Sequence, residues 1–183
     1  MANADSVGKD LGRAVAHAPS GHWDTGAEVD RVTLAFDDRH RRRIRLDTDG
    51  GATVLLDLPR AVALSDGDGL SLEEGGWIRI VAPPEAVMEV RATDRHHLLR
   101  LAWHIGNRHL PAEILEDAIL LRPDHVIADM LRGLGATVTE AERPFQPEGG
   151  AYDHGHGHDH AHDHSHDGHS HDAGHSQHHR HHD

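Results

Sequence analysis

Histidine, a metal-binding side chain, dominates the carboxyl-terminal part of this 183-residue chain. The sequence holds 22 histidines, and 14 of them lie within residues 151–183. From His154 to His166 a histidine occupies every second position, with Gly, Asp, Ala or Ser between. Neutral imidazole binds nickel, copper, zinc and cobalt, and short flexible spacers allow several rings to reach one ion. The candidate ligands of this tail are His154, His156, His158, His160, His162, His164, His166, His169, His171, His175, His178, His179, His181 and His182.

A purification tag or a purely solubilising tail could also produce a polar segment at the end of a chain. A tag is an uninterrupted run of histidine, whereas this tract is interleaved with other residues, and a solubilising tail would use Glu, Lys and Ser. The tail has too few apolar residues to offset the entropy of ordering it, so we expect residues 149–183 to be disordered. Without fixed geometry, its selectivity would follow the metal affinity series, which suits capture or storage.

Composition excludes several classes of site and partner. The absence of cysteine rules out disulfides, thiolate zinc sites, iron–sulfur clusters and cysteine nucleophiles, so a metal must be held by nitrogen and oxygen ligands. A formal net charge of −13 disfavours nucleic-acid binding. The arginines at 39, 41, 42, 43 and 45 are a local exception, and we expect them to be solvated on one face of a hairpin. With no membrane-spanning run and no signal-peptide pattern, we expect a cytoplasmic protein.

Short alternating runs predict a small amino-terminal β-domain over residues 26–84, preceded by a flexible extension over residues 1–25. Apolar residues alternate with others over residues 32–36 and 44–46, which predicts two strands around a polar turn. Further short apolar runs raise the total to five or six strands, as in a small sandwich or open barrel.

The spacing of apolar residues changes after Pro83-Pro84, which predicts a second domain over residues 85–148. A strand is followed by an amphipathic helix, and we expect Gly106 or Asn107 to adopt the left-handed conformation at its exit. Two short strands, a second helix and a final strand complete the order β-α-β-β-α-β, the ferredoxin-like arrangement. The predicted class is therefore α+β: a small β-domain, a ferredoxin-like domain and a disordered His-rich tail.

Histidines in the second domain are candidates for a defined metal site. His104 lies in the last turn of its helix, where the helix dipole favours an imidazolium. His96 and His97 lie near the helix start, away from the apolar stripe, so we expect both to be solvated. His125 lies in the first turn of the second helix. His109 follows the end of the first helix in a loop, where functional residues concentrate.

Residues 103–111, W-H-I-G-N-R-H-L-P, resemble the signature H-[LI]-G-N-R-H-x-P of the UreE family of urease accessory proteins, which are nickel metallochaperones. Residues 123–135, which contain D-H-V, a methionine and G-L-G, resemble a second family segment at the expected distance. The histidine-rich carboxyl terminus is a third family feature. Together these segments make the resemblance specific.

The resemblance implies a β-domain similar to a heat-shock peptide-binding domain, a ferredoxin-like metal-binding domain, and a homodimer that shares one nickel ion across its interface. When the family signature is matched to this sequence residue by residue, the shared ligand corresponds to His109. His125 matches a second, more peripheral metal-binding histidine, and His104 the first histidine of the signature. Pro123 stands where some members have another histidine, which weakens the peripheral site. The implied cargo is Ni(II), with Zn(II), Cu(II) or Co(II) as other candidates at the same sites.

We therefore expect a nickel metallochaperone without enzymatic activity, which delivers Ni(II) during assembly of the urease active site. The implied partners are the urease apoprotein and urease accessory proteins, including the GTPase UreG, with no nucleic acid and no membrane. The alternative is a general divalent-metal buffer that acts through its tail. A metallohydrolase ranks low because the sequence contains no HExxH or similar cluster of ligands and base. The sequence does not specify which metal is preferred. It also allows either a dimer or a larger, metal-bridged oligomer.

Overall fold

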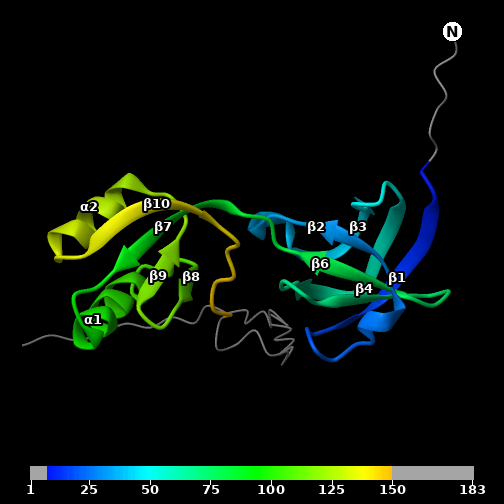
Figure 1. The fold of residues 1–183 in the computed structure, drawn as a ribbon, viewed down its shortest axis with the longest axis horizontal. Coiled ribbons are helices and arrows are strands. Elements are labelled where there is room, and N and C mark those ends of the chain that lie inside the picture. Colours follow the sequence, from blue (N-terminus) through cyan, green and yellow to red (C-terminus); the bar gives the residue numbers. More distant parts are fainter. Residues whose placement is uncertain (1–7, 150–183) are drawn as a thin grey trace, which may run out of the picture. The chain divides into compact units, whose positions relative to one another are not determined.

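The computed structural model describes residues 8–149, which form a mixed α+β fold of two β-sheets and two α-helices (Figure 1). In this part of the chain, neither helix is long and apolar enough to cross a membrane. The first sheet has six strands: β1 (Asp10–Ala18), β2 (Glu28–Thr33), β3 (His40–Asp47), β4 (Thr53–Ala63), β5 (Gly69–Leu72) and β6 (Trp77–Val81).

Strand β1 lies inside the first sheet, whose strand order is β2-β6-β5-β1-β4-β3. It pairs in parallel with β4 and antiparallel with β5, so segments distant in sequence meet at it. The predicted flexible extension over residues 1–25 is therefore wrong for residues 10–18. The local signal is weak because the register shifts between Asp10 and Arg13, and because Ala14 is the one strongly buried residue of the strand.

The strands predicted around residues 32–36 and 44–46 correspond to β2 and β3, but these do not form a hairpin. Strand β2 pairs in parallel with β6, and β3 pairs antiparallel with β4, so β2 and β3 lie at opposite edges of the sheet. A 3-10 turn at Phe36–Asp38 redirects the chain between them. Alternation of apolar residues indicates a strand but does not identify its partner.

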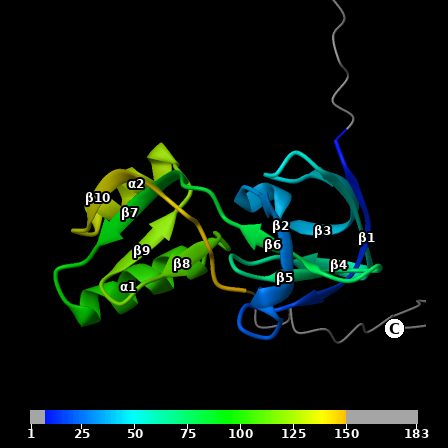
Figure 2. The ribbon, with the colours of Figure 1, turned by 45° about the vertical axis from the view of Figure 1, so that its right-hand side comes forward.

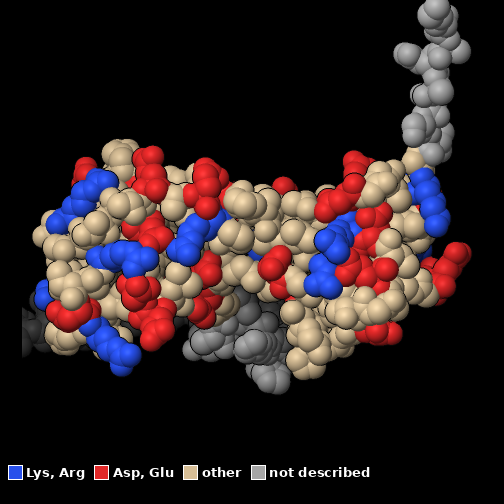
Figure 3. Space-filling model, in the orientation of Figure 1, with Lys and Arg blue, Asp and Glu red and all other residues tan. Residues whose placement is uncertain are grey.

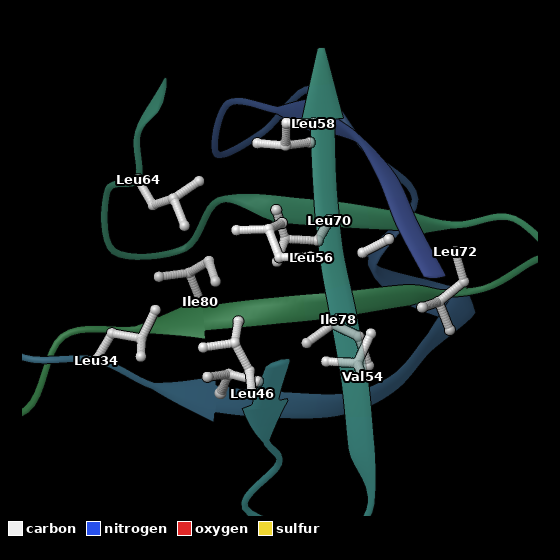
Figure 4. Close-up of a cluster of buried hydrophobic side chains, with 12 residues drawn as sticks. Leu34, Leu46, Val54, Leu56, Leu58, Leu64, Leu70, Leu72, Ile78 and Ile80 are labelled. Atoms are coloured by element: carbon white, nitrogen blue, oxygen red, sulfur yellow. The ribbon is translucent and has the colours of Figure 1, made fainter. Parts of the chain in front are cut away.

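The core of the first sheet consists of aliphatic side chains (Figure 4). Val54, Leu56 and Leu58 are buried at alternate positions of β4, and Ile78 and Ile80 are buried in the same way in β6. Figure 4 shows these side chains gathered in one cluster. Each buried Leu or Ile contributes about 1.5–3 kcal/mol to stability, which explains how the domain folds with few aromatic residues.

The second sheet has the strand-helix-strand-strand-helix-strand order predicted from the sequence (Figure 2). Its four strands are antiparallel, in the order β10-β7-β9-β8. Both helices pack on the sheet face that presents Met88, Val90, Ile119 and Leu121, because all of these belong to one buried cluster with helical residues such as Leu131. The elements are β7 (Glu85–Arg91), α1 (Arg95–Gly106), β8 (Ala112–Ile114), β9 (Ala118–Leu121), α2 (His125–Gly133) and β10 (Thr137–Arg143).

The segment after β10 covers the opposite face of the second sheet. Phe145 is fully buried there against Val87 and Leu120. Its ring also meets Phe36 edge-on, with centroids 5.2 Å apart. Phe36 belongs to the turn between β2 and β3, so this contact joins the first half of the chain to the second.

Arg39 is buried, and the prediction that it is solvated is wrong. Its side chain donates hydrogen bonds to the carbonyl oxygen of Phe145 and to Oε1 of Gln146, at 3.0 Å from the latter. Burial lowers the pKa of this guanidinium, while the nearby carboxylate of Glu85 opposes that effect. Arg39 thereby ties the segment after β10 to the start of β3.

The other arginines of the cluster lie at or near the surface, and three of them pair with carboxylates. Figure 3 shows Lys and Arg interspersed with Asp and Glu on the face displayed, rather than gathered into one basic area. The charge of the cluster is thus partly neutralised within the chain. The pairs are Arg41 with Asp38, Arg43 with Asp57, and Arg45 with Asp10.

Candidate metal centre

Helix α1 positions three of the candidate histidines. Asp94 caps its start, because the carboxylate accepts a hydrogen bond from the His97 N–H at 2.8 Å. That bond lowers the pKa of Asp94 below its ordinary value. The predicted apolar stripe faces the core, where Leu101 and Ile105 are buried. The helix is therefore anchored along one side as far as Ile105, near its end.

His109 lies in the turn that follows α1, and its backbone is left-handed, with φ of 54°. It is the one non-glycine residue with positive φ among residues 8–149. The expectation that Gly106 or Asn107 would take this conformation is wrong: Asn107 is right-handed, with φ of −64°. The left-handed exit falls two residues later, where the His109 N–H donates to the Gly106 carbonyl at 3.0 Å.

A left-handed conformation costs a residue with a side chain about 1–2 kcal/mol, although His tolerates it better than most. The neighbours of His109 hold it in this state. Leu110 is half-buried against the cluster beneath α1, and Pro111 restricts the backbone that follows. The imidazole itself is exposed. His109 therefore places an exposed imidazole on a turn anchored at both ends.

His104 lies in the last turn of α1 and is half-buried. Its ring meets the Trp103 ring edge-on, with centroids 5.0 Å apart. Its carbonyl oxygen accepts a hydrogen bond from Nη1 of Arg108 at 2.6 Å. His104 thus contributes to the structure of the helix end through its backbone as well as offering a ring nitrogen.

His125 is the first residue of α2 and is exposed. The carboxylate of Asp124 accepts hydrogen bonds from the N–H groups of Val126 at 2.8 Å and Ile127 at 3.1 Å. Asp124 therefore caps the start of α2. The neighbouring His125 has no structural role of its own among residues 8–149.

His96 is exposed as predicted, but the prediction that His97 is solvated is wrong, since its exposure is 8%. Its Nδ1 accepts a hydrogen bond from the Thr93 N–H at 3.2 Å and lies 3.0 Å from the Thr93 hydroxyl. With Nδ1 as acceptor, Nε2–H donates to the Leu134 carbonyl, 3.0 Å away. Both ring nitrogens are therefore occupied, and His97 links the start of α1 to the end of α2 rather than offering a metal ligand.

The candidate ligands do not converge within the described part of one chain. Residues 8–149 contain no group of three or more His, Asp or Glu side chains arranged to hold a metal ion. His104, His109 and His125 each present an imidazole to the surface or near it. The predicted ligands from His154 to His182 lie outside the described residues. The imidazoles suit nickel and other borderline metals, but residues 8–149 of one chain supply them singly.

An apolar surface on α1 was not anticipated from the sequence. Leu99 and Trp103, one turn apart, are 70% and 64% exposed. Together with His96, Arg100 and His104 they line a groove of about 380 Å³. The available signal was two large apolar residues at i and i+4, off the stripe that faces the core.

Comparison with known proteins covers nearly the whole chain. The family described as UreE urease accessory protein, N-terminal domain, matches residues 11–83. The family described as UreE urease accessory protein, C-terminal domain, matches residues 85–183. The first match includes residues 11–18 of β1, which shows that the strand missed from the sequence belongs to the family domain.

Several curated proteins named Urease accessory protein UreE are similar to the chain. That of Chelativorans sp. (strain BNC1) is 59% identical over 128 residues, which cover 69% of this chain and 81% of the relative. That of Rhodopseudomonas palustris (strain HaA2) is 54% identical over 135 residues, covering 74% of this chain and 62% of the relative. That of Mesorhizobium japonicum is 51% identical over 144 residues, covering 79% and 74%. The chain thus spans less than two thirds of the Rhodopseudomonas relative.

Proposed function

The chain belongs to the family of UreE urease accessory proteins, and on this basis we propose that it binds Ni(II) and delivers it during assembly of the urease active site. Membership makes it an accessory protein of urease maturation and not an enzyme. In this proposal nickel is the cargo of the protein, held by ligands that must also release it.

The observation that best supports nickel delivery is the placement of His109. Its exposed imidazole sits on a turn whose left-handed backbone is unfavourable for a residue with a side chain. Such conformations persist only where the surrounding structure holds them, and they concentrate at functional sites. An exposed imidazole in a fixed position suits an ion that must enter and leave by ligand exchange.

We propose that a second copy of the chain completes this centre. One imidazole is a weak site, and residues 8–149 of a single chain offer no cluster of three ligands. The exposed Leu99 and Trp103 provide an apolar surface on the helix that leads to His109. A two-fold contact through this surface would bury it and allow one His109 from each copy to share an ion. Two imidazoles leave coordination positions open for an acceptor protein.

The remaining histidines would serve capture rather than presentation. His125 is exposed and His104 is half-buried, so either could assist near the shared ion or bind a separate one. With two to four rings per ion, the 14 tail histidines could hold on the order of four to six divalent ions. We propose the urease apoprotein and urease accessory proteins, including the GTPase UreG, as cytoplasmic partners.

A general divalent-metal buffer is the second candidate function, favoured by the number of histidines in the tail. Zn(II), Cu(II) and Co(II) bind the same ligands, and a tail without fixed geometry would not discriminate among them. In this case the folded residues would bind almost no metal on their own.

Activation of urease apoprotein distinguishes the two candidates. We expect the nickel-loaded full chain, added with the other accessory proteins, to activate more urease than the same total nickel supplied as a salt. His109→Asn removes the imidazole at a position whose backbone Asn also tolerates. Loss of the advantage in this variant supports delivery through His109. Equal activation by the variant would favour the buffer.

A further inference from the structure

The turn after α1 has to keep His109 in a conformation that costs free energy. Its N–H bond to Gly106 and the Arg108 N–H bond to Ile105, both 3.0 Å, are short-range contacts at an exposed helix end. Helix ends fray, because their last carbonyl groups lack partners within the helix. A histidine freed from this turn would relax towards the extended region, and its imidazole would leave its fixed position.

One side chain closes this helix end. Nη1 of Arg108 donates to the carbonyl oxygen of His104, four residues earlier, at 2.6 Å. The distance is short, as expected when a charged donor meets one of the exposed carbonyl groups at the negative end of a helix. The contact therefore connects the last turn of α1, at His104, to the loop that follows the helix, at Arg108.

Arg108 has no competing ion pair in the described part of the chain. Twelve other arginines of this part pair with carboxylates, whereas Arg108 has no carboxylate within 4.0 Å among residues 8–149. It is exposed, so it does not contribute to a core either. Its specific contact is therefore the bond to the helix that precedes His109.

We propose that Arg108 is a positioning residue for His109. By holding the His104 carbonyl it keeps the helix end closed, so that the adjacent His109 stays in the left-handed state with its imidazole presented. Arg108 does not bind the ion itself. This inference rests on the proposed nickel function of His109, because positioning matters only if the imidazole is a ligand. The apparent affinity falls in proportion to the fraction of molecules with the imidazole in place.

The test compares Arg108→Ala, Arg108→Lys and a control, Arg132→Ala, in a fragment of residues 1–150. Every described strand and helix, and each hydrophobic cluster, lies within residues 8–149, so this fragment contains the whole described fold. Arg132 is a matched control because it is an exposed arginine in the last turn of the other helix, bonded to the Asp129 side chain. Calorimetry measures Ni(II) affinity, and the ¹³Cα and ¹³Cβ shifts of His109 report its backbone conformation.

We expect Arg108→Ala to weaken nickel binding on the order of tenfold, the lower end of the effect of removing a group that orients a metal-ligating histidine. The His109 shifts should move towards extended values while the unfolding temperature stays close to wild type. Arg108→Lys can still donate to the carbonyl and should recover most of the affinity. Arg132→Ala should behave as wild type.

Two outcomes overturn different claims. If His109→Asn abolishes binding but Arg108→Ala leaves the affinity and the His109 shifts unchanged, Arg108 has no positioning role and the proposed function stands. If His109→Asn itself leaves nickel binding unchanged, the proposed function fails, and the positioning inference fails with it.

Discussion

Arg39 donates a hydrogen bond to the carbonyl oxygen of Phe145, so a buried guanidinium just before β3 holds the segment that follows β10. The bond joins the two halves of the chain, and residues 8–149 accordingly belong to one compact unit. A second donor of the same side chain reaches Gln146, whose Oε1 also accepts from the Asp66 N–H at 2.7 Å. The junction between the sheets is thus polar and specific.

Replacing Arg39 should therefore lower stability. Arg39→Lys keeps the charge but replaces two donor nitrogens in a rigid fork with a single nitrogen, so the hydrogen bonds to the Phe145 carbonyl and Gln146 lose their geometry. We expect the free energy of unfolding to fall by about 1–3 kcal/mol in urea titrations. Arg42→Lys, at an exposed position of β3 three residues after Arg39, should change it by less than about 0.5 kcal/mol. Equal effects of the two substitutions would contradict a structural role specific to Arg39.

His97 should matter for folding and not for nickel. His97→Ala removes an acceptor for Thr93 and a donor for the Leu134 carbonyl. We expect a loss of about 1–3 kcal/mol in the free energy of unfolding, with the number of nickel ions bound to folded protein unchanged. His40→Ala, at an exposed position of β3, is the control for loss of a histidine. A stable variant that had lost nickel would show that His97 is a ligand after all.

Two substitutions of His109 should have the same effect on nickel binding but different effects on stability. Both His109→Gly and His109→Ala remove the imidazole, so both should abolish the nickel bound by the 1–150 fragment. Glycine adopts a φ of 54° without the penalty that Ala has, so the Gly variant should be more stable than the Ala variant by about 1 kcal/mol. Thermal unfolding of the two metal-free fragments measures this difference. An Ala variant as stable as the Gly variant would mean that residue 109 is not left-handed in solution.

Lowering the pH should destabilise α1, because it protonates the Asp94 carboxylate that caps the helix. The His97 N–H bond to the Asp94 carboxylate lowers the pKa of Asp94 from the ordinary value of 3.8. A group with a depressed pKa in the folded state stabilises that state fully above its unfolded pKa, and the effect is lost as pH falls through the folded value. The contribution of Asp94 should therefore be complete above about pH 5, decline as the pH falls below the ordinary value of 3.8, and disappear below the lower pKa of the folded state. Asp94→Asn retains a capping side chain and should remove this part of the pH dependence in the 1–150 fragment.

Local patterns were enough to predict the second half of the chain. Its helices follow the period of Leu98, Leu101 and Ile105, and its strands follow one another closely in sequence. The loop around His109 could be predicted because the histidine follows a helix end and belongs to a recognisable signature. Its unusual backbone was assigned to the wrong residues, since Gly106 and Asn107 adopt the left-handed state more readily than His.

Long-range contacts were not predictable in the same way. Strand β1 exists because β4 and β5 flank it, and its own sequence contains little alternation. Arg39 is buried only because the chain returns to it at Phe145, and His97 is buried only because α2 ends beside it. The exposed Leu99 and Trp103 could have been identified as apolar residues off the core stripe.

The central claim is that His109 from two copies shares one nickel ion. Native mass spectrometry of the 1–150 fragment tests it most directly, since the tail ligands are then absent and mass reports oligomer and metal together. We expect one nickel ion per dimer for the wild-type fragment and a metal-free species for His109→Asn. Nickel bound to a monomer, or retained by the dimer of the His109→Asn variant, would contradict the claim.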